Sequence, residues 1–184
     1  MGRCWPQRRR LPFLTDRAFL GGLDAEAGIE HLYPSLVEDK LAGRHVSTWT
    51  DAELDDFCRR YNVGWVVCYS TANVQRLRAW AGAAETLTLP DAKSILFTLQ
   101  RRPHSFALKG EAQLVHADSS HITLSEVVPK DGVVVLSFHY QSGMRVTPAS
   151  VSVEREPDAL DPVAFVRLRV DGPVACVTLT WDGR

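Results

Sequence analysis

Two histidines and a carboxylate stand close together in the stretch HADSSH, as His116, Asp118 and His121. Imidazole nitrogen and carboxylate oxygen can together bind a divalent metal ion. The same letters also fit a tight β-hairpin, because Asp and Ser are favoured in turns and the histidines then occupy the flanking strand ends. We favour the hairpin, and we expect no metal site and no cofactor in this chain.

A second group of reactive residue types lies near the N-terminus, in GGLDAEAGIEH. A carboxylate pair and an imidazole beside a glycine hinge could transfer protons, so a small hydrolase using Asp24, Glu30 or His31 stays open. The segment matches neither a GxGxxG loop nor a Walker loop. We keep these three residues as weak candidates for binding and expect no catalytic activity in this chain alone.

Polar and aromatic residues also gather at a strand end, in LSFHYQSGMRV. His139, Tyr140 and Arg145 could contact a ligand there, since an aromatic ring can stack on a sugar. Half-buried aromatic residues of a sheet would give the same pattern. The loop EPDALDP offers carboxylates for calcium, but it lacks the ligand alternation of a dedicated calcium loop, and we interpret it as a solvated loop.

The four cysteines, at positions 4, 58, 68 and 176, form no CxxC motif. Cys58 and Cys68 lie on a predicted helix and on the strand that follows it. A catalytic thiol needs a base, and no histidine is near them in sequence. We expect buried scaffold residues, with a disulfide between Cys58 and Cys68 as an open alternative.

Composition predicts a folded protein: 45% of the 184 residues are hydrophobic and 23% are charged. The net charge of −1 gives no general attraction for nucleic acid, and we expect no nucleic-acid partner. The five arginines near the start predict a solvated terminus. No apolar run reaches the length of a membrane helix, and no signal peptide is recognisable.

Residues 50–103 carry clear helix and strand signals. Thr50 and Glu53 form a capping box at the start of a helix, VGWVVCY predicts a buried strand, and a second helix begins at Ser70 or Thr71 and ends at Gly82. ETLTLP and KSILFTLQ predict two more strands. The expected order is helix, strand, helix, strand, strand, a small α/β layer.

From residue 104 to residue 184 the helical period is lost, and eight strand candidates alternate with turn signals. They are SFALKG, AQLVHA, HITLSEV, VVVLSFHY, MRVTP, SVSVER, AFVRLRV and ACVTLTW. This spacing favours an antiparallel β-sandwich. The expected fold class is α+β: an irregular entry segment over 1–49, a small α/β N-terminal layer over 50–103, and the β-sandwich over 104–184.

The strand RRYNVGWVVCYS after its short helix, preceded by FLGGLDAEAGIEH and LAGR, resembles the tail of large bacterial membrane proteins. So do ILFTLQRRPHSFAL and VVVLSFHYQSGMRVTPASVSVE. The family is that of multi-pass glycosyltransferase-like (GT-C) proteins, including the YfhO-like group, and the resemblance covers about residues 13–184.

The resemblance implies a soluble extracytoplasmic domain, on the outer face of a bacterial membrane, with the membrane-embedded part of the same parent protein as its partner. Such a domain would be non-catalytic and would bind glycan or shape the acceptor site. The membrane helices of the family are absent from this chain, as are its acidic loop residues, so no catalytic residue carries over. A stand-alone protein-interaction module is the alternative.

Overall fold

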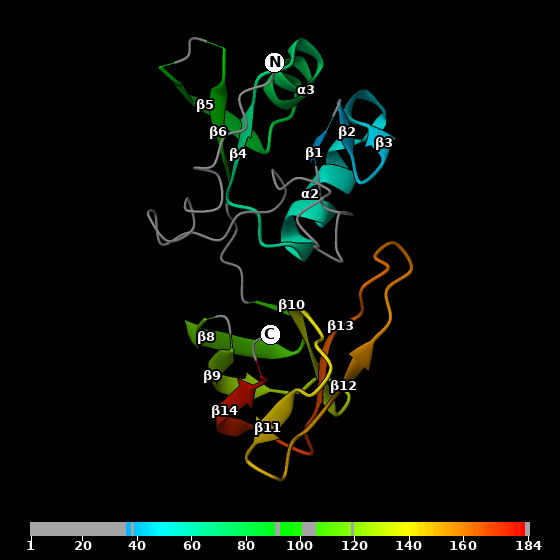
Figure 1. Cartoon of the computed structure of the whole chain (residues 1–184), viewed down its shortest axis with the longest axis vertical. Helices are drawn as coiled ribbons and strands as arrows, with labels where there is room; N and C mark the ends of the chain where they lie inside the picture. Colours follow the sequence, from blue (N-terminus) through cyan, green and yellow to red (C-terminus); the bar gives the residue numbers. More distant parts are fainter. Residues whose placement is uncertain (1–35, 38, 91–92, 101–105, 119, 183–184) are drawn as a thin grey trace. The chain divides into compact units, whose positions relative to one another are not determined.

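A computed structural model of the chain describes residues 36–37, 39–90, 93–100, 106–118 and 120–182 (Figure 1). Asp24, Glu30 and His31, most of the expected entry segment and Cys4 lie outside the described residues. The chain divides into two compact units. The N-terminal unit comprises residues up to Asp56 together with Val63–Gln100, and the C-terminal unit comprises Phe57–Asn62 and the residues from Arg101 onward. The described residues are mostly antiparallel β structure, with two short α-helices.

The N-terminal unit contains two small antiparallel sheets, ordered β1-β2-β3 and β4-β6-β5. The observed order over residues 50–100 is the one expected from sequence: helix, strand, helix, strand, strand. The elements are β1 (Leu36–Val37), β2 (Lys40–Leu41), β3 (Arg44–His45), a short 3-10 helix η3 (Val46–Thr48), α2 (Asp51–Arg60), β4 (Trp65–Cys68), α3 (Thr71–Ala79), β5 (Ala83–Thr88) and β6 (Ile95–Leu99).

Both helix starts predicted from sequence are confirmed. The Thr50 amide donates to Glu53 Oε2 at 2.7 Å and the Glu53 amide donates to Thr50 Oγ1 at 3.3 Å, which closes the capping box. Hydrogen bonds from Arg44 and then from Thr50 lower the pKa of Glu53 to about 2. Ser70 caps α3 by accepting from the Asn73 amide at 3.2 Å.

The predicted end of the second helix at Gly82 is wrong. Helix α3 ends at Ala79, and Trp80 is its C-cap in an extended conformation. A Cβ at Gly82 would lie 2.5 Å from Cε2 of Trp80, so glycine here makes room for the indole ring.

Strand β4 is less buried than expected. Cys68 is buried, as is Phe97 on the neighbouring strand β6, but Val67 is 40% exposed. Burial raises the pKa of Cys68 to about 11, which keeps this thiol neutral as a scaffold residue. Cys58 is half-buried, and no disulfide joins it to Cys68, so the disulfide alternative is wrong. Cys176 is also free but exposed, against the expectation of burial.

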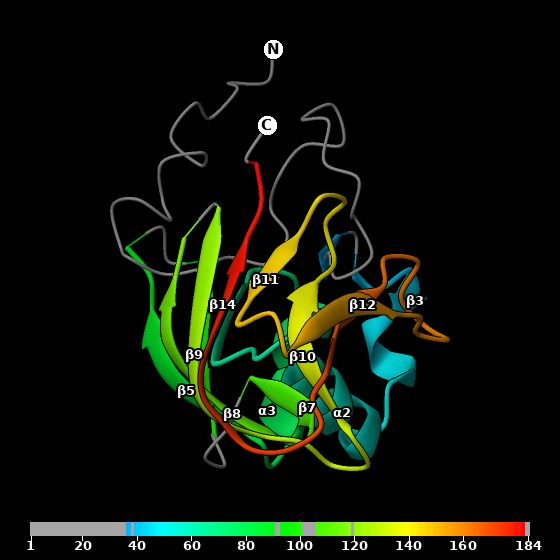
Figure 2. The same ribbon diagram turned by 90° about the horizontal axis from the view of Figure 1, so that it is seen from below.

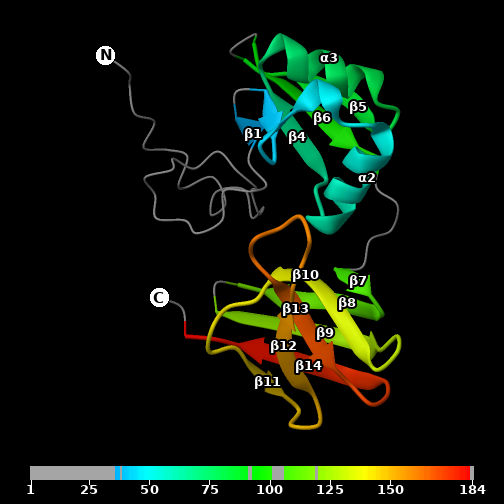
Figure 3. The same cartoon turned by 90° about the vertical axis from the view of Figure 1, so that its right-hand side faces the viewer.

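The C-terminal unit holds two four-stranded antiparallel sheets, ordered β12-β13-β10-β7 and β11-β14-β9-β8. In Figure 3, strands β10, β12 and β13 lie in front of β8, β9 and β14. Each strand matches one of the eight predicted segments to within one residue at its ends, or lies inside it. They are β7 (Ala107–Lys109), β8 (Glu111–Ala117), β9 (His121–Val128), β10 (Val133–His139), β11 (Arg145–Thr147), β12 (Ser152–Glu156), β13 (Phe165–Arg169) and β14 (Val174–Thr180).

One hydrophobic cluster joins the two sheets of this unit. Leu124 and Leu179 from one sheet and Leu136 and Leu168 from the other are completely buried in it. Alternate residues of β13 point away from the cluster, as the pattern FVRLRV predicts, so Arg169 pairs with Glu154 at 2.6 Å on the outer face. No helix in the described part of the chain is long and apolar enough to cross a membrane.

Candidate functional site

Phe165 breaks the polar pattern on the outer face of β13. It alternates with Val166, which lies in the hydrophobic cluster, yet Phe165 itself is 2% exposed. The residues at the end of α2 and the end of β10 cover it: the ring centroid of Tyr61 lies at 6.1 Å and that of His139 at 5.1 Å. Burial of this ring therefore depends on the segment Phe57–Asn62, which belongs to the same unit.

The carboxylate of Asp161 lies fully buried beside this aromatic group. Its Oδ2 atom accepts hydrogen bonds from the Tyr61 hydroxyl and from Nε2 of His139 at 3.0 Å. Its Oδ1 atom accepts from the Val163 amide at 2.8 Å. The Asp161 side chain therefore links Tyr61 and His139, which are distant in sequence, to its own loop.

Two opposing effects act on the pKa of Asp161. Burial raises it, but the hydrogen bonds from Tyr61, from the Val163 amide and from His139 together lower it more. The pKa lies below the ordinary value, so the group is an anion at neutral pH. Nε2 of His139 accordingly carries a proton and donates a hydrogen bond to the carboxylate.

The loop EPDALDP is not simply solvated, as the sequence suggested. Asp161 is 4% exposed, and Asp158 Oδ1 accepts from the amides of Leu160 at 2.8 Å and Asp161 at 3.0 Å. Asp158 Oδ2 pairs with the Arg60 guanidinium. These carboxylates form the turn and bind the end of α2, and the contacts cross about 100 residues of chain, which the local pattern does not reveal.

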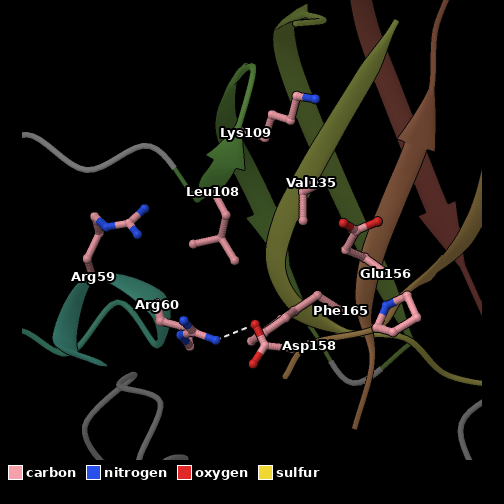
Figure 4. Close-up of a pocket in the computed structure, with 9 residues that line it drawn as sticks. Arg59, Arg60, Leu108, Lys109, Val135, Glu156, Asp158 and Phe165 are labelled. Carbon is pink, nitrogen blue, oxygen red and sulfur yellow. Dashed lines mark hydrogen bonds and ion pairs between the residues drawn. The ribbon is translucent and has the colours of Figure 1, made fainter. Parts of the chain in front are cut away.

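A pocket of about 230 Å³ opens next to the Arg60–Asp158 pair (Figure 4). Apolar side chains and charged side chains line it together. The apolar ones are Leu108, Val135, Pro157 and Phe165, and the charged ones are Arg59, Arg60, Lys109, Glu156 and Asp158.

Protein contacts hold several charged groups of this pocket in place. Besides the Arg60–Asp158 pair, Glu156 Oε2 lies 2.9 Å from Arg167 Nε, and Lys109 Nζ lies 3.1 Å from Asp131 Oδ2. Groups that are already oriented lose little conformational entropy when a ligand binds. The arrangement can accept and donate several hydrogen bonds at its rim above an apolar floor.

The structure places the sequence candidates of the C-terminal unit in different surroundings. His139 bonds to Asp161 and stacks on Phe165. Tyr140 is partly buried against the core, with the Arg155 guanidinium 5.2 Å from its ring centre. Arg145 begins β11 in the other sheet and lies 4.0 Å from the exposed Asp182. The three residues therefore do not form one site.

The residues that form the pocket were missed by the sequence reasoning. From the sequence alone, Arg59 and Arg60 are two cations at the end of the predicted helix, and Lys109 lies in the predicted strand SFALKG. The one related signal in the sequence is the group of three carboxylates in EPDALDP, one of which pairs with Arg60. By contrast, His116, Asp118 and His121 do lie together at the β8–β9 turn.

The comparisons with known proteins assign no family and no function to this site. Comparison with protein-family models, with curated proteins and with solved structures finds no match.

Proposed function

We propose that this chain is a non-catalytic binding domain whose C-terminal unit takes one ring of a saccharide in the pocket beside Arg60 and Asp158. The observation that carries the proposal is the lining of this pocket. Charged groups held by protein partners stand above an apolar floor. A sugar ring has the matching character, with hydroxyl groups at its edge and C–H groups on its face.

The dimensions favour a single ring over a chain. The volume of about 230 Å³ lies just below the roughly 300–1,000 Å³ that is typical of small-molecule sites. Arginine and carboxylate groups can each make two parallel hydrogen bonds, which suits neighbouring hydroxyl groups. Three cationic side chains face two carboxylates in the lining, which favours a sugar that carries an acid group.

Recognition would rest on hydrogen bonds and not on aromatic stacking. A glycan-binding groove that uses stacking would expose an aromatic ring such as Tyr140 or Trp181, but both are partly buried against the core. Phe165 in the pocket floor is 2% exposed.

The buried His139–Asp161 pair supports a binding role over a catalytic one. A general base must reach the proton that it removes. Asp161 instead has both carboxylate oxygens engaged, by Tyr61, His139 and the Val163 amide, and its side chain is fully buried. We infer that the pair stabilises the fold under the pocket.

Our proposal also includes the wider setting that the resemblance implies. The two sheets of the C-terminal unit would form a β-sandwich, the helices and sheet of residues 50–100 a small α/β layer, and both would lie on the extracytoplasmic face beside the membrane-embedded part of one parent protein. Sequencing the genomic DNA upstream of the Met1 codon tests this setting. In-frame membrane spans would support it, and an in-frame stop codon without such spans would contradict it.

The pocket is tested by ¹⁵N–¹H NMR titration of the chain with glucuronate and with glucose. We expect the amide signals of Leu108, Lys109 and Asp158 to shift, with glucuronate binding more tightly. Lys109→Ala should weaken glucuronate binding about tenfold, the equivalent of one charge-assisted hydrogen bond. Lys130→Ala, at an exposed lysine outside the pocket, should leave it unchanged. Absence of shifts with both sugars would contradict the proposal.

An apolar row in the N-terminal unit favours protein interaction as a second candidate function. Val67 and Leu87 stand opposite Leu96 in the sheet register, so the three share one face of the β4-β6-β5 sheet. Val67 is 40% exposed and Leu87 is 53% exposed. If a partner protein covers this row, Leu87→Lys will abolish its binding while glucuronate binding persists.

A further inference from the structure

Strands β8 and β9 lie side by side in one sheet (Figure 2). The turn between them brings three potential metal ligands together: His116, Asp118 and His121. His116 stands opposite Thr123 in the register, and His121 lies two residues before Thr123 on β9. His116 and His121 therefore point to the same side of the sheet, away from the cluster that contains Ile122 and Leu124, and Asp118 lies in the turn between them. The Asp118 amide donates to the His121 carbonyl at 2.9 Å and closes the turn.

The ligand atoms are spaced as a metal ion requires. Asp118 Oδ2 lies 3.2 Å from His116 Nε2 and 3.9 Å from His121 Nδ1, and all three ligand atoms lie within 4.8 Å of one another. Ligands in a tetrahedral zinc site, with bonds of 2.0–2.2 Å, are separated by about 3.4 Å. Small side-chain rotations would therefore complete the site.

Neighbouring groups already orient two of the three ligands. Asp118 Oδ1 accepts from the Ser120 amide at 2.8 Å and from the Ser120 hydroxyl at 3.2 Å, so Oδ2 is the atom that faces the imidazoles. His121 Nε2 lies 2.8 Å from Thr123 Oγ1. When Nε2 carries the proton and donates a hydrogen bond to Thr123 Oγ1, Nδ1 keeps its lone pair for a metal ion. Metal-binding histidines use this arrangement.

We propose that His116, Asp118 and His121 bind one divalent ion of the zinc class, through Nε2, Oδ2 and Nδ1 respectively. Two imidazole nitrogens and one carboxylate oxygen suit Zn²⁺, Co²⁺ or Ni²⁺, whereas Ca²⁺ and Mg²⁺ prefer oxygen ligands. The site is exposed, so the remaining positions of the ion are open to water. It is independent of the saccharide pocket.

The test is calorimetric titration of the metal-free chain with ZnCl₂. We expect one ion per chain, and at least tenfold weaker binding in His121→Gln and in His116→Gln. His45→Gln, the same change at an exposed histidine of the N-terminal unit, should bind as the original does. Thr123→Val should weaken binding about tenfold, because it removes the group that orients His121.

Two spectroscopic readouts separate this site from the thiols of the chain. The Co²⁺ complex should lack thiolate-to-metal charge-transfer absorption, and ¹⁵N NMR should identify Nδ1 of His121 and Nε2 of His116 as the bound nitrogens. A thiolate band, unchanged affinity in His121→Gln, or no bound ion would each overturn the proposal.

Discussion

At the scale of single residues, Asp161 joins segments of the C-terminal unit that are distant in sequence. Its carboxylate receives hydrogen bonds from Tyr61, from His139 and from the Val163 amide. A buried hydrogen bond adds only about 1 kcal/mol when it is formed, but a buried charge left without a donor costs more. The network therefore affects stability chiefly because its disruption would leave the buried Asp161 carboxylate without hydrogen-bond donors.

Tyr61→Phe should lower the free energy of unfolding of the C-terminal unit by about 1–3 kcal/mol at neutral pH, because it removes one donor from a buried carboxylate. The folded pKa of Asp161 is lowered, so its stabilising contribution is present above the unfolded value of about 3.9 and is lost as the pH falls through the folded value. The difference between the two proteins should therefore shrink in acid, as measured by urea unfolding across pH.

Tyr69→Phe is the matched control for this change, since Tyr69 is 74% exposed. It removes the same hydroxyl group without touching a buried partner and should change stability by less than about 0.5 kcal/mol. Equal effects of the two substitutions at neutral pH would contradict the role given to Asp161.

At the scale of elements, two glycines in turns of the C-terminal unit share a backbone conformation but differ in the space around them. Gly110 and Gly132 both have φ +74°, which disfavours any side chain. A Cβ at Gly110 would also lie 2.8 Å from the Val128 carbonyl oxygen, whereas a Cβ at Gly132 would meet nothing within 4 Å. Gly132→Ala should cost about 1 kcal/mol and Gly110→Ala clearly more, measured by urea unfolding. Equal costs would contradict the steric contribution.

The sequence predicted the helices and strands far better than the contacts between residues that are distant in the chain. The eight strands of residues 104–184, the Thr50 capping box and the Ser70 cap depend on neighbouring residues, so local patterns reveal them. The alternation of FVRLRV puts Phe165 on the side of Arg167 and Arg169, and this local pattern does not show that Tyr61 covers it. The pocket was missed for the same reason, since Arg60 and Asp158 are 98 residues apart.

At the scale of the whole molecule, the division of the chain does not follow a single point in the sequence. The sequence change near residue 103 suggested one boundary, whereas Phe57–Asn62 belong with the C-terminal unit. Phe57 and Tyr61, 4.7 Å apart between ring centroids, contribute buried aromatic surface to that unit. Part of its core is therefore encoded about 40 residues before the rest.

A fragment of residues 104–184 should consequently unfold at a lower urea concentration than the C-terminal unit does within the full chain. Exposing Phe165 alone would cost about 2 kcal/mol, and Asp161 would lose the Tyr61 donor as well. A peptide of residues 51–62, added in excess, should restore part of the stability, and the same peptide with Tyr61→Phe should restore less. Identical urea midpoints for the fragment and for the unit in the full chain would mean that Phe57–Asn62 contribute nothing to the C-terminal core.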